Sequence, residues 1–269
     1  MPFPPRYARD RQSQRLGPLF ERLRLALARG DSGNVLRADA TALAPESLLV
    51  FELRQPLITF ALAIAAVPGL ELVGEDIAEL ADDEGRDFEG FYYLVLPDAA
   101  ATAQLLALWT RWDAGQALGQ AHARWKDVFE CLHALRRWGP KDRLRPEDAE
   151  FIRDMAQHQP NDDILLEIEL LFRGGVEADA ARADAIASIQ AVGGRVLQQV
   201  RHDGFAFDAL LAALPAREAL SAANYAPGSL AALDSAFSIH VQSLTDATAV
   251  ELDDEAIAGA ADADELDLT

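Results

Sequence analysis

The residue types that serve nucleophilic catalysis occur together in two short strings, Asp31-Ser32-Gly33 and His202-Asp203-Gly204. A working Ser-His-Asp triad needs its acid and its base on well-positioned elements beside an activated serine. Here the first string follows the predicted end of a helix, and the second has the composition of a turn between two strands. No serine stands in a G-x-S-x-G elbow. The residues therefore provide no recognisable catalytic motif.

Metal or cofactor binding is not predicted either. The histidines are His122, His133, His158, His202 and His240. No two of them form an H-x-x-x-H pair, and Cys131 has only His133 near it in sequence. The acidic strings at residues 82–84 and 162–163 lack the spacing of a calcium-binding loop. The glycine pairs at 174–175 and 193–194 belong to neither a Walker A nor a G-x-G-x-x-G motif, so we expect no cofactor.

The overall charge argues against nucleic acid as a partner. The 269 residues carry 24 Lys and Arg against 44 Asp and Glu, a formal net charge of −20, which would repel a polyanion. The charge is unevenly spread: residues 1–37 hold eight Arg and three acids, whereas residues 246–269 hold nine acids and no Lys or Arg. The acidic end is typical of a disordered, solubilising tail or linker, with a docking peptide as the alternative.

The same composition bears on cellular location. The chain starts with MPFPPRYARD, which lacks the apolar run of a secretory signal, and its single cysteine cannot form an intramolecular disulfide. The longest apolar run, residues 57–69, is shorter than the roughly 20 residues that a membrane-spanning helix needs. We therefore expect a cytoplasmic protein that does not enter a membrane.

Hydrophobic periodicity predicts the elements that must position any site. In the first half we expect a helix over 16–27, a strand over 47–54, a helix over 57–67, a strand over 70–73, an acidic loop over 75–89, a strand over 91–97 and a helix after Asp98. In the second half we expect a strand over 164–172, a helix over 178–192, a strand over 195–200, a strand within 205–215, a helix over 216–223 and a strand over 237–241.

The second half thus has the order βαββαβ, which is the ferredoxin-like arrangement, an antiparallel sheet with two helices on one side. The first half matches it except for its last strand, which is not recognisable. We predict an α+β fold with two ferredoxin-like modules, a helical insert between them and an N-terminal helix. The expected domains are an N-terminal helical arm (1–43), a first module with the insert (44–160), a second module (161–245) and the acidic tail (246–269).

The insert opens with the most distinctive segment of the chain, residues 123–144. Its apolar residues have helical spacing, and Trp138-Gly139-Pro140 is predicted to end the helix. Basic residues gather here on an otherwise acidic chain, a pattern that occurs at docking surfaces and also where a helix packs on a sheet. The apolar face is Trp125, Val128, Phe129, Leu132 and Leu135. The candidate interaction residues are Arg124, Lys126, Arg136, Arg137, Trp138, Lys141, Asp142 and Arg143. We expect the basic ones to be exposed.

Several spaced segments together carry a resemblance. They are APESLLVFEL (44–53), VPGLELVGED (67–76), FYYLVLPDAAATAQLLALW (91–109), WKDVFECLHALRRWGPKDRL (125–144) and DILLEIELLFR (163–173). In this order they resemble the N-terminal region of large bacterial subtilisin-like (S8 family) serine peptidases. Residues 193–243 are similar to the second N-terminal module of that family, which resembles subtilase propeptides. The Asp, His and Ser motifs of the peptidase domain do not occur in these residues, so no catalytic residue is carried over.

The resemblance implies a noncatalytic region that regulates or recruits a subtilisin-like serine endopeptidase. In that family the peptidase is encoded beside an AAA ATPase, in pairs associated with phage defence. A ferredoxin-like module inhibits such a protease by laying its sheet on it and sending the following segment, here from about Gln242, through the active-site cleft. The expected partners are therefore a subtilisin-like peptidase domain, in cis or in trans, and an AAA ATPase. The alternative is a free-standing interaction or sensor subunit that binds an ATPase through residues 125–143.

Overall fold

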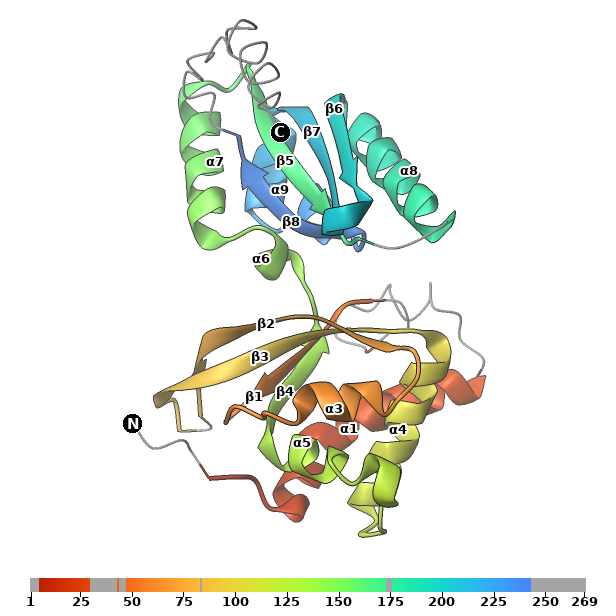
Figure 1. The fold of residues 1–269 in the computed structure, drawn as a ribbon. Helices are drawn as coiled ribbons and strands as arrows, with labels where there is room; N and C mark the ends of the chain where they lie inside the picture. The colour runs from red at the N-terminus through yellow and green to blue at the C-terminus, as the bar shows by residue number, and fades with distance from the viewer. Residues whose placement is uncertain (1–4, 30–42, 44–46, 83, 173–175, 243–269) are drawn as a thin grey trace, which may run out of the picture. The chain divides into compact units, whose positions relative to one another are not determined.

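A computed structural model describes residues 5–29, 43, 47–82, 84–172 and 176–242 (Figure 1). The chain forms two compact units. The first comprises Met1–Arg143 with Ala231–Asp234, and the second comprises Leu144–Leu230 with Ser235–Thr269. The structure thus divides the chain after Arg143 and not after residue 160. The predicted acidic tail, residues 246–269, and the end of the predicted N-terminal arm, residues 30–42, lie outside the described residues.

The first unit contains a four-stranded sheet in the order β2-β3-β1-β4, in which every neighbouring pair is antiparallel. Its elements are α1 (Arg9–Arg29), β1 (Leu49–Leu53), α3 (Phe60–Ala65), β2 (Leu70–Ala81), β3 (Asp87–Pro97), α4 (Ala99–Asp113), α5 (Trp125–Cys131), β4 (Leu132–Arg137) and α6 (Pro140–Arg143). From β1 to β4 this is the βαββαβ order with its ferredoxin-like strand arrangement. The missing last strand of the first module is β4.

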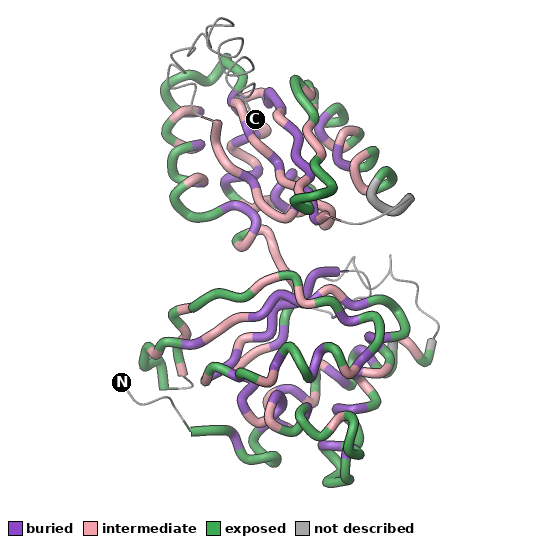
Figure 2. The backbone as a smooth tube through the Cα atoms, viewed as in Figure 1, coloured by how far each residue is buried: buried purple, intermediate pink, exposed green. Residues whose placement is uncertain are grey.

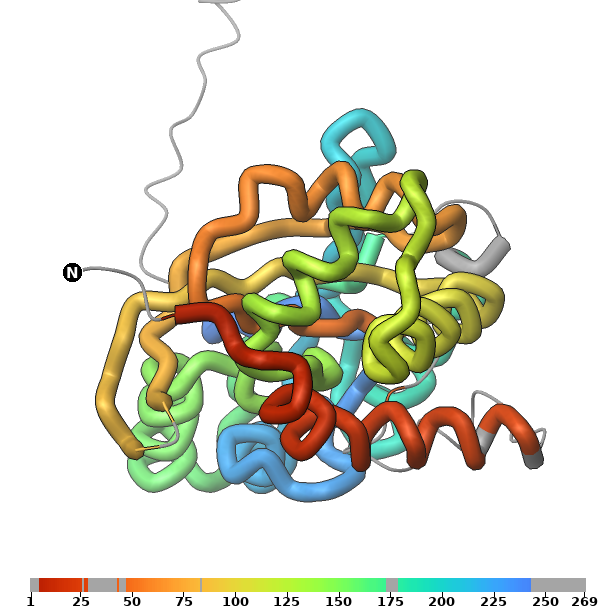
Figure 3. The backbone as a smooth tube through the Cα atoms, turned by 90° about the horizontal axis from the view of Figure 1, so that it is seen from below, coloured from red at the N-terminus to blue at the C-terminus, as the bar shows by residue number. Residues whose placement is uncertain are grey.

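The helices of the first unit cover one face of its sheet (Figures 1 and 3). Phe51 of β1 is fully buried on that face and lies edge-on to Phe60 of α3, with ring centroids 5.5 Å apart. The predicted N-terminal helix also belongs to this layer, because Phe20 of α1 stacks on Trp109 of α4 at 4.4 Å. Trp125 is fully buried and donates its indole N–H to the carbonyl of Ala63 at 3.0 Å. Aromatic packing therefore joins the helices to the sheet.

The strand β4 corrects the prediction that residues 125–135 form one helix. The helix α5 ends at Cys131, and β4 pairs with β1. The pairing shifts register by one residue between Glu52 and Leu53, so that Leu132 lies opposite Leu53 and Leu135 opposite Phe51. This bulge lets two residues three apart face the same core, which imitates helical spacing. Pairing with β1 decides the conformation.

A second correction concerns the acidic segment 75–89, which was expected to be a loop. It forms most of a long hairpin, in which β2 pairs with β3 from Leu70 opposite Pro97 to Ala81 opposite Asp87. The acidic residues of β2 are Glu71, Glu75, Asp76 and Glu79, and all are exposed. Because the carboxylates stay in solvent and the backbone is paired on one side, a high acidic content is compatible with a strand here.

The second unit repeats the topology with the strand order β6-β7-β5-β8. Its elements are α7 (Pro146–His158), β5 (Asp163–Leu170), α8 (Val176–Ala191), β6 (Arg195–His202), β7 (Phe207–Pro215), α9 (Ala216–Ala223) and β8 (Ala236–Val241). The α+β class and the two sheet modules are therefore as predicted. The later part of the expected insert, α7, belongs to this unit.

Buried and half-buried side chains alternate along β5, and this alternation distinguishes the two faces of the second sheet. Ile164, Leu166 and Ile168 are buried opposite Leu214, Ala212 and Leu210 of β7, and the residues between them point to the other face. The helix α8 ends as predicted at a glycine pair. Gly194 directly precedes β6, and a Cβ there would lie against the Leu214 side chain of β7 and the Ile189 carbonyl of α8, which favours glycine at this position.

No helix among the described residues is both long and apolar enough to cross a membrane.

Figure 2 shows which parts of the backbone are buried. In the first unit β1 is almost entirely buried, whereas β2 is largely exposed or intermediate.

The turn between β2 and β3 gives a testable prediction. Asp82 accepts the backbone N–H groups of Glu84 and Arg86, each at 2.9 Å, and pairs with the Arg86 guanidinium. The backbone hydrogen bond from Arg86, followed by that from its side chain, lowers the pKa of Asp82 to about 2. A lowered pKa stabilises the folded turn above the ordinary carboxyl pKa of about 4. We expect this stabilisation to be lost as the pH falls toward 2.

Carboxyl carbon shifts measured by NMR should therefore titrate with a midpoint near 2 for Asp82. The substitution Asp82→Asn should lower the melting temperature at neutral pH and have a much smaller effect at low pH, where the wild-type carboxyl is protonated. An equal effect of the substitution at both pH values would contradict this role.

Candidate functional site

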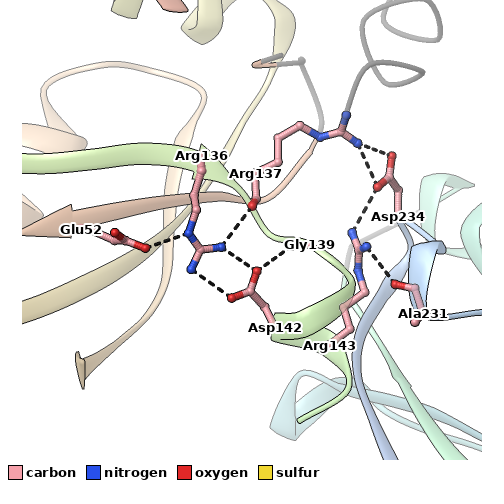
Figure 4. A network of polar contacts seen from close by, with 8 residues as sticks. All are labelled: Glu52, Arg136, Arg137, Gly139, Asp142, Arg143, Ala231 and Asp234. Carbon is pink, nitrogen blue, oxygen red and sulfur yellow. Dashed lines mark hydrogen bonds and ion pairs between the residues drawn. The ribbon is translucent and has the colours of Figure 1, made fainter. Parts of the chain in front are cut away.

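The predicted interaction residues from Arg136 to Arg143 lie where β4 ends and α6 begins, and Figure 4 shows the polar contacts of four of them, Arg136, Arg137, Asp142 and Arg143. Arg136 lies between two carboxylates. Its Nε is 2.7 Å from Glu52 Oε1 of β1, and its Nη1 and Nη2 are 2.6 and 3.0 Å from the two oxygens of Asp142. The second contact is a bidentate pair, the geometry that a guanidinium and a carboxylate favour.

Asp142 also holds the turn that leads into α6. Its carboxylate accepts the backbone N–H of Gly139 at 2.7 Å, and the Nη1 of Arg136 reaches the carbonyl of Arg137 at 3.3 Å. Trp138 continues the strand, because its backbone N–H donates to the carbonyl of Leu48 at 2.8 Å. The string Trp138-Gly139-Pro140 was predicted to end a helix; it instead connects the strand β4 to α6, and Arg136 and Asp142 hold this connection in place.

Arg137 and Arg143 meet at a single carboxylate, that of Asp234. The Nη2 of Arg137 lies 2.7 and 3.0 Å from its two oxygens, and the Nη2 of Arg143 lies 3.1 Å from one of them. Arg143 also donates to the carbonyl of Ala231 at 3.3 Å. The segment Ala231–Asp234 belongs to the first unit, so these contacts lie within that unit.

The prediction that these arginines are exposed was wrong. The side chains of Arg137 and Arg143 are only 7% and 4% exposed, against 34% for Asp234. Burial lowers the pKa of Arg143, and the neighbouring Asp234 acts against that effect. Guanidinium groups at this depth need a carboxylate partner, since an unpaired buried charge is costly. They serve the fold of the first unit.

Arg124, Lys126 and Lys141 remain on the exposed surface. Arg124 and Lys126 lie at the start of α5, where Lys126 is 3.8 Å from Glu130. Lys126 also borders a groove of about 710 Å³ whose lining includes Arg9 and Trp112. The exposed basic residues of the predicted surface are therefore Arg124 and Lys126 at the N-terminal end of α5, Lys141 on α6, and Arg136, which is exposed but paired with Glu52 and Asp142.

The groups that could act in catalysis or metal binding are placed as follows. Cys131 is fully buried, and burial raises the pKa of its thiol, which keeps it protonated. His202 precedes a short turn at Asp203–Phe205, as its composition predicted, while Asp31-Ser32-Gly33 lies outside the described residues. Within the described ranges, no group of three or more His, Cys, Asp or Glu could hold a metal ion.

A second candidate surface, none of whose residues was named from the sequence, is the face of the second sheet that the alternation of side chains along β5 leaves toward solvent. It carries Glu167 and Glu169 of β5, which lie opposite His240 and Ser238 of β8. The Ser238 hydroxyl donates to Glu169 at 2.9 Å. The Gln242 side chain donates to Glu167. Half-buried Leu211 of β7 lies beside Glu167, so this face mixes apolar area with carboxylates.

The sequence ILLEIELLF does indicate this face, because its two glutamates alternate with apolar residues that are buried in the structure. Only the register of β5 with β7 and β8 places both carboxylates on the same solvent-facing surface as Leu211.

No protein-family model matches the chain, and no curated protein matches it. One solved structure, described as the crystal structure of an unknown protein from Galdieria sulphuraria, is similar at 13% identity and a TM-score of 0.20. The match covers 66% of this chain and 90% of that one. So low a TM-score carries no argument about function. The structure defines an α+β protein of two ferredoxin-like units.

The shared carboxylate of Asp234 predicts a marked effect on stability. Asp234→Ala removes the partner of two buried guanidinium groups, and we expect it to lower the free energy of unfolding by about 1–3 kcal/mol. Asp154→Ala is a matched control, because Asp154 pairs with His158 at an exposed site and should cost less than about 1 kcal/mol. Denaturant unfolding of both variants measures the difference.

For the same reason, Arg136→Glu combined with Arg137→Glu should lower the melting temperature. Equal stabilities of Asp234→Ala and the wild type would show that the network does not contribute to the fold.

Proposed function

We propose that this chain is a noncatalytic regulatory and recruitment region that binds a subtilisin-like serine protease in the cytoplasm, in a system where the protease works beside an AAA ATPase. The observation that supports the proposal is the topology of the second unit. Its βαββαβ order and its sheet arrangement are those expected of a subtilase propeptide-like module. The segment resemblance described above gives the class of partner.

The solvent-facing side of the second sheet is the proposed protease-binding surface. Leu165 and Leu211 are half-buried there and would lose the rest of their exposed area in a complex. Glu167 and Glu169 add negative charge to the same face. This charge suits basic side chains or the positive N-terminal ends of helices on the partner. Such a surface of apolar area with a few oriented polar groups resembles protein interfaces in general.

The end of β8 supports the proposed path of the chain into the protease. β8 is an edge strand next to β5, and its pairing continues beyond Val241, since the backbone N–H of Gln242 donates to the carbonyl of Leu165 at 3.0 Å. The chain is therefore extended up to Gln242. A peptide in that conformation is the form in which proteases bind substrates, so the segment after Gln242 would occupy the active-site cleft as an inhibitor.

Inhibition kinetics test this proposal. We expect the purified chain to inhibit subtilisin, used as the probe protease, in a concentration-dependent way. Truncation after Gln242 should weaken inhibition while leaving complex formation measurable by size-exclusion chromatography. Glu169→Lys, on the proposed surface, should weaken binding, whereas Glu150→Lys on the exposed face of α7 is a control with the same charge change and should not.

Rapid digestion of the chain without inhibition, and no complex with subtilisin, would contradict the proposal. Thermal melting of each variant separates loss of binding from loss of fold.

A second candidate function is supported by the basic pair that stays exposed. Arg124 and Lys126 lie on an otherwise acidic chain, and Lys126 borders a groove that also includes Arg9. This favours an interaction subunit that docks on an acidic surface, for which an AAA ATPase is the candidate. Exposed charges of this kind mainly accelerate association and add little to stability.

We expect Arg124→Glu with Lys126→Glu to leave the melting temperature unchanged, to slow association with the ATPase and to reduce the dependence of the association rate on salt. Surface plasmon resonance at two ionic strengths measures this. An unchanged association rate would exclude these residues as a docking surface.

A further inference from the structure

The strand β2 presents an edge that is available for pairing. It lies at the end of the first sheet, and β3 is its partner strand among the described residues. On its outer side, alternate backbone N–H and C=O groups point away from β3, and such an edge is a template for an added strand. The Ile77 N–H on this edge donates to the neighbouring Asp76 carboxylate at 2.8 Å, a contact that an added strand would replace. β2 runs over 12 residues, about twice the usual length of a strand. Register with β3 shifts between Leu72 and Gly74, so the regular edge extends from Gly74 to Ala81.

An apolar groove runs along this edge. It has a volume of about 840 Å³, and its walls are α3 with the turn before it on one side and β2 on the other. Ile58 is 96% exposed and Ile77 is 59% exposed, one on each wall, while Tyr93 and Phe91 lie on the floor. Large apolar side chains exposed together in a groove mark a binding site more often than a solvated surface.

The charges on β2 select between possible occupants. Glu75 and Glu79 point to the groove side together with Ile77, and Asp76 points to the opposite face. No Lys or Arg occurs in β2. A second copy of β2 would bring carboxylates opposite carboxylates, which destabilises a strand pair. A strand with basic residues at those positions would instead gain cross-strand ion pairs.

We infer that the β2 edge binds an extended segment of a partner protein that carries basic and apolar side chains, and that this segment adds to the sheet as a further strand. Its basic side chains lie opposite Glu75, Asp76 and Glu79, and an apolar side chain lies opposite Ile77 and enters the groove beside Ile58. The backbone hydrogen bonds give affinity, and the side chains give specificity. This site lies on the first unit and goes beyond the proposed function, which rests on the second.

The test uses the full chain and a fluorescein-labelled synthetic peptide built on the core Lys-Thr-Val-Lys-Lys, so that valine falls opposite Ile77. Fluorescence anisotropy should report saturable binding that weakens as salt rises. Hydrogen exchange should slow at amides of β2 when the peptide is bound. The same peptide with alternate backbone nitrogens methylated keeps its charge and its side chains but cannot pair with the edge, so it should not bind.

Variants of exposed residues identify the site without disturbing the fold. Glu75→Lys should weaken binding about tenfold, because an attractive cross-strand pair becomes a repulsive one. Ile77→Ser should also weaken binding. Glu150→Lys in the second unit has the same charge change as Glu75→Lys and should bind like the wild type.

Three results would overturn the inference. Equal binding of the methylated peptide would mean a purely electrostatic contact. Wild-type affinity in Glu75→Lys and Ile77→Ser would place the peptide elsewhere. Self-association of the chain that Ile77→Ser abolishes would make a second copy the occupant. Because the proposed function concerns subtilisin and the second unit, inhibition of subtilisin by Glu75→Lys separates failure of this inference from failure of that proposal.

Discussion

The pairing of β4 with β1 is the interaction on which the first unit depends. β1 is the central strand, paired on one side with β3 and on the other with β4. Phe51, together with Leu49 and Leu53 on the same face of β1, supplies the middle of the core. The register that brings Leu135 opposite Phe51 also places Arg136 beside Glu52, at the point where the chain turns into α6. One strand pairing therefore fixes the hydrophobic core and the polar corner together.

The ion-pair network of Arg136, Arg137 and Arg143 with Glu52, Asp142 and Asp234, here called the polar corner, explains why a cluster of basic residues need not be a binding surface. Arg137 and Arg143 share Asp234 while almost fully buried, and Arg136 is divided between Glu52 and Asp142. Bringing guanidinium groups to such depths is unfavourable unless each finds a carboxylate. The carboxylates come from three places distant in sequence. Basic residues that are close in sequence thus have different roles: Arg137 and Arg143 are buried ion-pair partners, whereas Arg124, Lys126 and Lys141 stay exposed.

The two units share a topology but differ in the surface that they offer. In the second unit, the side of the sheet that carries Glu167 and Glu169 combines carboxylates with half-buried leucines. In the first unit, the distinctive surface is the long edge strand β2 and the groove beside Ile58 and Ile77. A sheet face suits a folded partner, whereas a strand edge suits an extended segment. The same fold can therefore serve two kinds of binding, because the function lies in the surfaces and not in the topology.

Local pattern alone determined the α+β class, the amphipathic α1, the strands β1 and β5, and the helix α4 with Trp109 and Trp112 on its buried side. In each of these the side-chain period matches the element, so neighbouring residues contain the information. Tertiary structure decided the rest. Leu132 and Leu135 have helical spacing but form a strand, because a bulge against β1 turns both toward the core. The acidic residues of β2 have the composition of a loop, and they form a strand because their backbone pairs with β3. The exposure of Arg137 and Arg143 depends on Asp234, about ninety residues away, and no local pattern encodes a contact with a residue so distant in sequence.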